Sequence, residues 1–225
     1  MNNSLIRTVW FEGEHNSGKW SQISLLRELL DNLNIPSCVV RGALYRPGIG
    51  KCDYQWMMDP ENSYRKNIMQ EYNSIENMTT EEKIAFELQN ADRLNRELIV
   101  FLERYVPNYL KSHTPEQYRV IFDRTLLSSY YRFKRYNYTP DLSAHKIPIE
   151  TTFFLDVAQE TLLQRNTDRN ERNPSLHRAR ENNIAHNYGL WQQVMAEHPE
   201  KRIITLDGNK KKEELFEEIK NSLQI

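Results

Sequence analysis

The chain has few glycines and cysteines and no long apolar run, and the last two shortages each exclude a class of protein. Of its 225 residues, 7 are glycine and 2 are cysteine. Cys38 and Cys52 form neither a disulfide framework nor a metal-binding spacing, which favours a reducing compartment. No apolar run approaches the ~18 residues of a membrane-spanning helix, and residues 1–4 lack the apolar core of a signal peptide. We therefore expect a soluble, cytoplasmic protein without a membrane partner.

The chain also lacks an excess of charge of either sign. Its 30 Lys and Arg residues nearly balance 31 Asp and Glu residues, for a net charge of −1. No overall field draws such a chain to nucleic acid, so an anion site must be local. Tyrosines and basic residues interleave between Tyr130 and Tyr138, but the charge balance argues against stacking on single-stranded nucleic acid. The length and apolar content favour one compact domain over residues 1–225.

Short apolar runs alternate with amphipathic ones along the chain. The predicted strands are Leu5–Phe11, Ser37–Arg41, Arg119–Phe122, Thr152–Val157 and Arg202–Leu206. The predicted helices run from Lys19 to about Leu33, from Thr79 or Thr80 towards Pro107, and over Leu126–Arg135, Gln159–Asn166, Ser175–Glu197 and Glu213–Leu223. Thr79 and Glu82 have the spacing of a capping box. This order predicts an α/β fold with a five-stranded, mostly parallel sheet flanked by helices.

The segment between the first predicted strand and helix carries the clearest chemical signal. Gly13 and Gly18-Lys19 fit the phosphate-binding pattern G-x-x-x-x-G-K-[ST] up to its last position, where Trp20 replaces the hydroxyl. Glycines let backbone N–H groups wrap a phosphate, the helix N-terminus adds partial positive charge, and the lysine reaches the outer phosphates. An ordinary glycine turn is the alternative. The residues expected to bind the phosphorylated ligand are Gly13, Glu14, His15, Asn16, Ser17, Gly18, Lys19, Trp20 and Ser21.

Two later clusters have side chains suited to phosphate chemistry. Asp123 ends the third predicted strand, where an aspartate can hold the water shell of Mg²⁺, and the adjoining Arg124 can clamp a phosphate. A helix cap at Asp123 with a surface arginine is the alternative. Downstream of the fourth strand, mobile arginines could close over a transferred phosphoryl group, or form a solvated helix face. These are Arg165, Arg169 and Arg172.

Taken in order, these segments resemble the thymidylate kinase family of P-loop nucleoside-monophosphate kinases. The family loop "FEG-x-D-G-x-GKST-Q" is similar to FEGEHNSGKWSQ, and its strand "P-D-L-T-F-Y-L-D-V" is similar to IPIETTFFLDV. Its "REPGG", "A-x-R" and "DRY-x-x-S" segments resemble Tyr45–Gly50, Ala91-Asp92-Arg93 and Asp123–Ser128. The resemblance spans about residues 5–223. It implies a three-layer P-loop kinase fold with a small arginine-bearing lid at about residues 166–178.

The resemblance also implies an activity and roles for the residues. The activity is phosphoryl transfer from ATP to a nucleoside monophosphate such as dTMP, with Mg²⁺ as cofactor. Lys19 would contact the β- and γ-phosphates, and Asp123 would orient Mg²⁺ through water, with Ser21 as the nearest substitute for the missing hydroxyl. The acceptor would be bound by Arg46 (or Arg41), Gln89, Arg93, Arg124 and Ser128, and the lid would supply Arg165, Arg169 and Arg172. A nucleotide is the only partner implied, and the sequence leaves a homodimer open.

Departures from the family pattern concern the metal and the nucleobase. Trp20 replaces the hydroxyl that ordinarily binds Mg²⁺, and His15 replaces an acidic residue. Gln89 stands where the family tends to place a base-stacking phenylalanine, and the expected "AYQ" reads Tyr131-Arg132-Phe133. Two alternatives therefore stay open. One is a kinase of a deoxynucleoside or another nucleotide with a rebuilt base pocket, and the other is a nucleotide-binding regulatory protein with weakened catalysis.

Overall fold

A sheet of five parallel strands forms the centre of the computed structural model, which describes residues 6–14, 16–41, 77–100, 118–124, 126–141, 151–172, 184–197 and 203–225. The strand order is β2-β3-β1-β4-β5, and every neighbouring pair is parallel. The bounds are β1 (Ile6–Glu12), β2 (Ser37–Arg41), β3 (Tyr118–Asp123), β4 (Thr151–Asp156) and β5 (Ile203–Asp207). The predicted α/β class and five-stranded sheet are confirmed, and each predicted strand overlaps an observed one.

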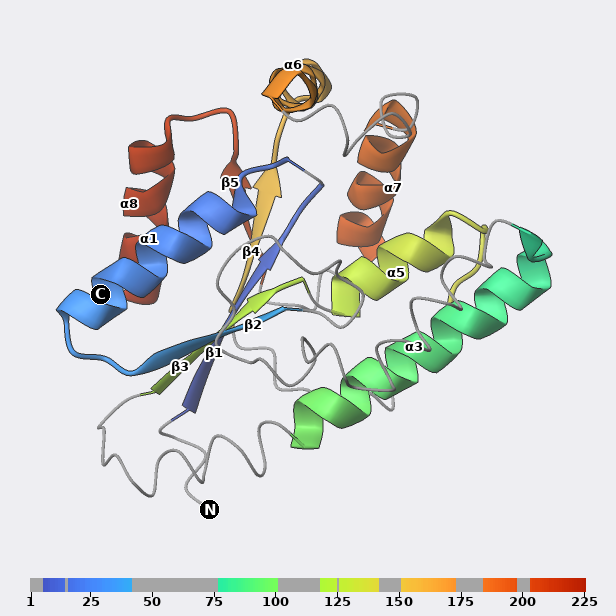
Figure 1. Cartoon of the computed structure of the whole chain (residues 1–225), viewed down its shortest axis with the longest axis horizontal. Coiled ribbons are helices and arrows are strands. Elements are labelled where there is room, and N and C mark those ends of the chain that lie inside the picture. The colour runs from blue at the N-terminus through green and yellow to red at the C-terminus, as the bar shows by residue number, and fades with distance from the viewer. Residues whose placement is uncertain are drawn as a thin grey trace.

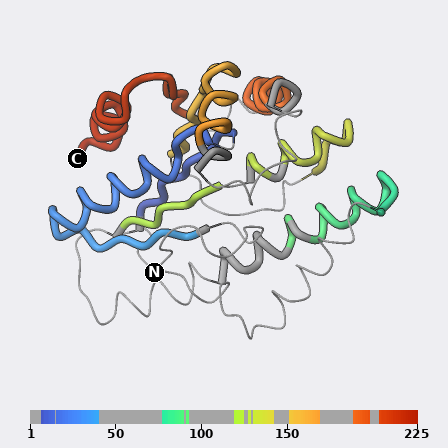
Figure 2. Tube along the Cα trace, turned by 45° about the horizontal axis from the view of Figure 1, so that its top comes forward, coloured from blue at the N-terminus to red at the C-terminus, as the bar shows by residue number. Residues whose placement is uncertain are grey.

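Helices cover both faces of this sheet (Figure 1). They are α1 (Lys19–Asn32), α3 (Thr80–Val100), α5 (Leu126–Lys134), α6 (Gln159–Arg172), α7 (Ile184–Glu197) and α8 (Lys212–Leu223). The neighbouring helices α1 and α8 lie on one face, and α5 and α7 lie on the other, with α3 packed against α5. Figure 2 shows α6 above the start of α1, near the ends of the central strands.

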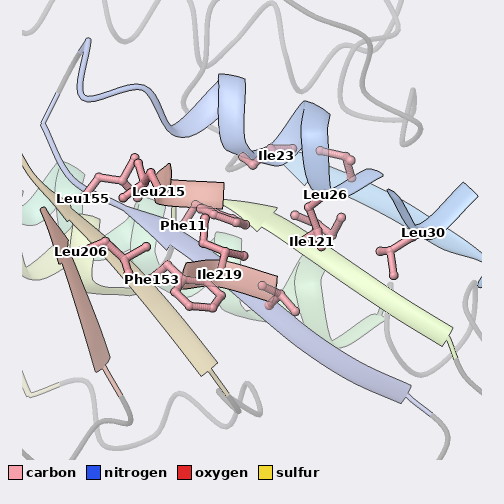
Figure 3. Packing of buried hydrophobic residues seen from close by; sticks show 12 residues of the cluster. Phe11, Ile23, Leu26, Leu30, Ile121, Phe153, Leu155, Leu206, Leu215 and Ile219 are labelled. Carbon is pink, nitrogen blue, oxygen red and sulfur yellow. The ribbon is translucent and has the colours of Figure 1, made fainter. Parts of the chain in front are cut away.

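The two faces of the sheet bury different side chains because successive strand residues point in opposite directions. Phe11, Ile121 and Phe153 point towards α1 and α8, where they meet Leu26 and Ile219 in one apolar cluster (Figure 3). On the other face, Phe154 contacts Trp191 of α7, whose ring stacks on Tyr131 of α5 with centroids 4.7 Å apart. Burial on both faces explains why the strands are continuous apolar runs in the sequence.

Local signals set several helix ends. Helix α1 starts after Gly18, whose φ of 96° is accessible to glycine, and it ends before the left-handed Asn34 (φ 54°). The capping box of α3 is confirmed, since the Thr79 N–H donates to Glu82 Oε2 at 2.7 Å and the Glu82 N–H donates to Thr79 Oγ1 at 3.2 Å.

Three helices differ by more than one residue from the sequence-based bounds. Helix α3 is described to Val100, and the rest of the stretch predicted towards Pro107 lies outside the described ranges. Helix α6 continues past the predicted end at Asn166 to Arg172, since no glycine or proline interrupts it before Pro174. The first part of the expected lid, residues 166–172, is thus helical, and residues 173–178 lie outside the described ranges. Helix α7 begins at Ile184, and the start predicted at Ser175 also lies outside them. No helix in the described part of the chain is long and apolar enough to span a membrane.

Candidate active site

The loops that carry the predicted site residues meet at one edge of the sheet. Because all five strands are parallel, the loop after β1, Arg124 after β3 and Gly208 after β5 follow strand ends at the same edge. Strands β2 and β3 lie on one side of β1 in the sheet, whereas β4, which follows β3 in the chain, lies on the other side of β1. In open α/β sheets, ligands bind at such a reversal of strand order, outside the carboxyl ends of the strands.

The conformation of the loop after β1 requires its glycines. Gly13 has a φ of 132°, and a Cβ atom there would lie 2.7 Å from the Leu155 carbonyl oxygen and 3.0 Å from Ser17 Oγ. Gly18 has a φ of 96° and caps α1. The loop therefore passes so close to β4 that no side chain fits at its first position. This close passage distinguishes the loop from an ordinary turn, and it suits backbone N–H groups that wrap a phosphate.

The Lys19 ammonium lies inside this loop. Its Nζ donates to the carbonyls of Gly13 and Glu14 at 2.9 and 2.7 Å and to Ser17 Oγ at 3.2 Å. The residue is only 7% exposed. Burial, assisted by the positive charge of Arg124, lowers the pKa of Lys19 to about 8, although nearby carboxylates oppose the shift. The lysine is thus a poorly solvated cation that an incoming anion would stabilise.

Asp123 and Arg124 lie at the end of β3, at the same edge of the sheet, and are close enough to Lys19 to affect its pKa. Asp123 ends β3 and is 6% exposed. Arg124 has a left-handed φ of 74°, and its N–H donates to the Phe11 carbonyl at 3.0 Å. Non-glycine residues in this conformation cluster at binding and catalytic sites, where the surrounding structure holds them. The two residues therefore present a carboxylate and a guanidinium at the edge where the phosphate loop begins.

Glu12, for which the sequence suggested no role, joins the loop to α5. Its carboxylate is fully buried and accepts the Ser128 N–H at 3.2 Å and the Ser128 hydroxyl at 2.7 Å. A carboxylate is favourable there because the first turn of a helix has free N–H donors. The Ser128 hydroxyl, expected at the acceptor, is thus bonded to Glu12 and helps to place α5 relative to Arg124.

A second contact joins α5 to the loop. The Tyr131 hydroxyl donates to Glu14 Oε2 at 3.3 Å, while its ring stacks on Trp191. Burial, followed by the charge of Glu14, raises the pKa of Tyr131 above its ordinary value. Tyr131 therefore stays protonated at neutral pH and holds Glu14 beside Lys19.

Helix α6 contacts the far side of the loop. Arg165 donates to the carbonyls of Asn16, Ser17 and Gly208 at 3.4, 3.3 and 2.9 Å. The next residue, Asn166, accepts a hydrogen bond from the Asn16 side chain at 3.2 Å. Burial lowers the pKa of Arg165, which still remains charged. Of the three predicted lid arginines, this one therefore binds the backbone of the loop.

The expected Mg²⁺ ligands differ in how well they fit a metal. Trp20 is half-buried and packs against the apolar cluster under α1. Ser21 is exposed on α1, and its N–H donates to the Gly18 carbonyl at 3.0 Å. Asp123 does fit, because Mg²⁺ commonly keeps several waters and needs one or two carboxylates besides the phosphate oxygens. The donor set thus fits Mg²⁺ through Asp123, with no hydroxyl at position 20.

The structure describes the remaining predicted site residues only in part. Gln89 is exposed on α3. Arg41 ends β2 in register with Asp123, Arg93 lies in α3, and Arg169 and Arg172 lie in α6, but their side chains are outside the described parts of the structure. His15 and Arg46 lie outside the described ranges altogether.

Sequence reasoning missed the partners that hold the loop, namely Glu12, Tyr131 and Asn166. Glu12 had a usable signal, because a charged residue directly before Gly13 ends an otherwise apolar run. Tyr131 and Asn166 had none, because their contacts join positions 117 and 150 residues apart in the chain.

The family assignment follows from a comparison with protein-family models. The model described as thymidylate kinase matches residues 60–219, which is more than half of the chain. The chain belongs to the thymidylate kinase family. As a member of that family it is a nucleotide kinase, and the predicted resemblance is confirmed. The match begins at residue 60 and so does not cover Gly13–Lys19. No curated protein matches the chain in sequence.

Solved structures with the same fold agree with this kinase assignment. Deoxyadenosine kinase from M. mycoides, solved with the products dCMP and a flexible dCDP, is 16% identical with a TM-score of 0.54, over 97% of this chain and 99% of that one. The same kinase with dATP is 14% identical with a TM-score of 0.53, over 97% and 100% of the two chains. At such low identity the likeness establishes the P-loop kinase fold alone.

The close passage at Gly13 generates a first prediction for this thymidylate kinase family member. Gly13→Ala should lower the free energy of unfolding by about 1–3 kcal/mol, because the left-handed region is strained for alanine and the new Cβ meets the Leu155 carbonyl. Nucleotide binding should be lost as well. Chemical unfolding and calorimetric titration measure both effects.

Gly189 provides the matched control. It lies in α7, and a Cβ there would meet nothing within 4 Å, so Gly189→Ala should stabilise the protein by about 1 kcal/mol. If Gly13→Ala leaves the free energy of unfolding as high as Gly189→Ala does, the close approach of Gly13 to the Leu155 carbonyl is contradicted.

The position of Trp20 generates a second prediction. Trp20→Ser should lower the free energy of unfolding by about 1–3 kcal/mol, less than the loss of a fully buried tryptophan, because the ring is half-buried against the core. If Trp20 serves only for packing, the Mg²⁺ concentration needed for nucleotide binding stays unchanged. Melting curves and a Mg²⁺ titration test this, with Glu28→Ala as the control at an exposed position of the same helix. A stable variant that needs less Mg²⁺ would show that the tryptophan weakens a metal site instead.

Proposed function

We propose that the protein transfers the γ-phosphoryl group of ATP to the phosphate of a deoxynucleoside monophosphate, dTMP or a related nucleotide. One observation carries the proposal: a buried lysine is held inside a glycine loop at the carboxyl ends of the central strands, beside Asp123 and Arg124. This is a site for a polyphosphate with a second anion next to it.

In this proposal the loop binds the donor nucleotide. Its backbone N–H groups would surround the β-phosphate, and Lys19 would exchange its carbonyl contacts for oxygens of the β- and γ-phosphates. Mg²⁺, when bound, neutralises charge on these phosphates, and Asp123 would hold its water shell. The other loop residues expected at the donor are Glu14, His15, Asn16, Ser17 and Gly18.

The acceptor's phosphate would lie on the α5 side of the loop. Arg124 and Arg93 would hold it, with Arg46 or Arg41 as a further clamp and Gln89 towards the base. An oxygen of this phosphate attacks the γ-phosphorus, and the bond from the γ-phosphorus to the bridging oxygen of ADP breaks. Arg169 and Arg172 would neutralise charge on the transferred group. Alignment and electrostatics carry the rate, so the loss of one clamp costs roughly 10²–10³-fold.

A deoxynucleoside hydroxyl as the acceptor is the second candidate. Two observations favour it: the structural neighbours are deoxyadenosine kinases, and α3 presents the exposed polar Gln89 instead of an aromatic residue. An ion pair between Arg132 Nε of α5 and Glu87 Oε2 of α3, 3.4 Å apart, also places charge at the expected "AYQ" segment, and Glu87 is buried there. A purely regulatory nucleotide-binding protein is the third outcome of the test.

A screen of acceptors with coupled detection of ADP tests the function. Phosphorylation of a deoxynucleoside monophosphate, dTMP among them, supports the proposal, and turnover only with deoxynucleosides supports the second candidate. ATP binding without turnover on any acceptor leaves the regulatory role.

Lys19→Ala should abolish ATP binding and turnover, since it removes the cation from the loop. Arg124→Ala should weaken binding of the acceptor far more than binding of ATP.

The lowered pKa of Lys19 generates a prediction about pH. In the free protein the pKa is about 8, and bound phosphates raise it because they favour the charged form. ATP affinity should therefore be constant below about pH 8 and should fall above it by up to about ten-fold per pH unit, as binding must then take up a proton. Calorimetric titration at constant Mg²⁺ between about pH 7 and pH 9.5 measures this.

Lys19→Arg is the matched control for this prediction. The guanidinium stays charged over the whole range, so whatever affinity the variant retains should not fall between about pH 8 and pH 9.5. An equal fall in both proteins would assign the pH dependence to a group other than Lys19.

A further inference from the structure

Two consecutive residues of α6 hold the loop from its outer side. Arg165 Nη1 donates to the carbonyls of Asn16 and Ser17 at 3.4 and 3.3 Å, and its Nη2 donates to the Gly208 carbonyl at 2.9 Å. Asn166 is 1% exposed and accepts from the Asn16 side chain at 3.2 Å. Both the main chain and the side chain of Asn16 are thus bonded to α6, and Arg165 also joins the loop to the turn after β5.

These contacts stabilise a conformation that the loop does not favour by itself. Asn16 is left-handed, with a φ of 65°. This region costs an ordinary non-glycine residue roughly 1–2 kcal/mol and costs asparagine less, so it is tolerated but not preferred. The free loop would therefore sample other conformations. The hydrogen bonds that Arg165 donates and the one that Asn166 accepts hold the loop in the observed conformation. The bond to Asn166 is protected from competing water because this side chain is buried.

Each carbonyl that accepts a hydrogen bond from Arg165 in the loop belongs to a peptide unit that also carries an N–H group. The Asn16 carbonyl belongs to the same peptide unit as the Ser17 N–H, which donates to the Glu14 carbonyl at 3.2 Å. The Ser17 carbonyl belongs to the same peptide unit as the Gly18 N–H, and this N–H is the one that would donate to an anion in the loop. A cationic donor on a carbonyl oxygen polarises its peptide, so the attached N–H becomes a stronger donor. Through the peptide of Ser17 and Gly18 the guanidinium can strengthen anion binding without contact with the anion.

We propose that Arg165 is a positioning residue of the phosphate loop. It strengthens binding of the nucleotide's β-phosphate through the Gly18 N–H, whose peptide carbonyl it binds, and it does not contact the transferred phosphoryl group. The inference deepens the proposed function and rests on it, since it requires a nucleotide in the loop. It separates Arg165 from Arg169 and Arg172, which remain the proposed contacts of that group.

The test compares ADP with ATP, because only ATP carries the transferred phosphoryl group. Calorimetric titration at constant Mg²⁺ uses the wild-type chain, Arg165→Ala and Arg169→Ala. Arg165→Ala should weaken ADP and ATP equally, by about ten-fold each. Its turnover at saturating ATP should stay within about two-fold of wild type, because the loss lies in binding that substrate and transition state share. Arg169→Ala should instead weaken ATP more than ADP and lower turnover.

Gln164→Ala is the neutral control. Gln164 is exposed on the same helix, and its side chain bonds only Asp168 in the described structure, so both affinities should match wild type. If Arg165→Ala does not fold, Arg165→Gln, which keeps an amide donor but loses the charge, carries the same comparison. A selective loss of ATP affinity with a large fall in turnover would overturn the proposal, and so would unchanged affinities for both nucleotides.

Amide hydrogen exchange of the ligand-free protein separates this inference from the proposed function. The segment 13–19 should exchange about ten-fold faster in Arg165→Ala than in wild type, because its outer hydrogen bonds are lost. Gln164→Ala should leave the exchange unchanged. Equal exchange in wild type and Arg165→Ala would overturn the positioning role. A wild-type protein that binds neither nucleotide would instead overturn the proposed function, whatever the exchange shows.

Discussion

Two cationic side chains donate hydrogen bonds to four carbonyl oxygens of the loop after β1, and much of the site depends on these bonds. A loop that wraps an anion with its N–H groups leaves carbonyls on its other sides, and buried carbonyls without donors are costly. Here two cations supply donors: Lys19 for Gly13 and Glu14, and Arg165 for Asn16 and Ser17. The first comes from the helix that follows the loop and the second from α6, so the shape of the loop depends on both.

Burial makes this charged arrangement responsive to a ligand. Glu12, Lys19 and Asp123 are all less than 10% exposed, and charges in such surroundings need partners or shift their pKa. The lysine's pKa falls to about 8 because the neighbouring carboxylates only partly offset its lost hydration and the charge of Arg124. The oxygens of a polyphosphate placed next to Lys19 would favour the charged form of this lysine.

The parallel sheet makes these contacts possible, because it brings the ends of strands far apart in sequence to one edge. Glu12 at the end of β1 can hold Ser128 in α5, and Gly13 can pass against the carbonyl of Leu155 in β4. The aromatic stack of Tyr131, Trp191 and Phe154 fixes α5 and α7 on the face of the sheet below this edge. Family membership shows a nucleotide kinase, and neither the family nor the fold specifies which nucleotide accepts the phosphoryl group.

Local patterns by themselves determined the strands, most helix starts, the capping box at Thr79 and the position of the phosphate loop. Each depends on neighbours within a few residues: apolar runs, a glycine with positive φ, or a side chain that reaches a nearby N–H. The length of α6 was underestimated, because residues 164–172 contain no apolar residue that would continue the helical pattern.

Only the tertiary structure decided which residues hold the loop and what the predicted site residues contact. Ser128 donates to Glu12, and Arg165 donates to backbone carbonyls of the loop. Trp20, at the position of the expected metal-binding hydroxyl, packs against the apolar core. These outcomes depend on pairs separated by more than 100 residues, whose distance is set by the sheet order and helix packing. A sequence pattern specifies which chemical groups are present, whereas their partners follow from the packing that brings distant strand ends together.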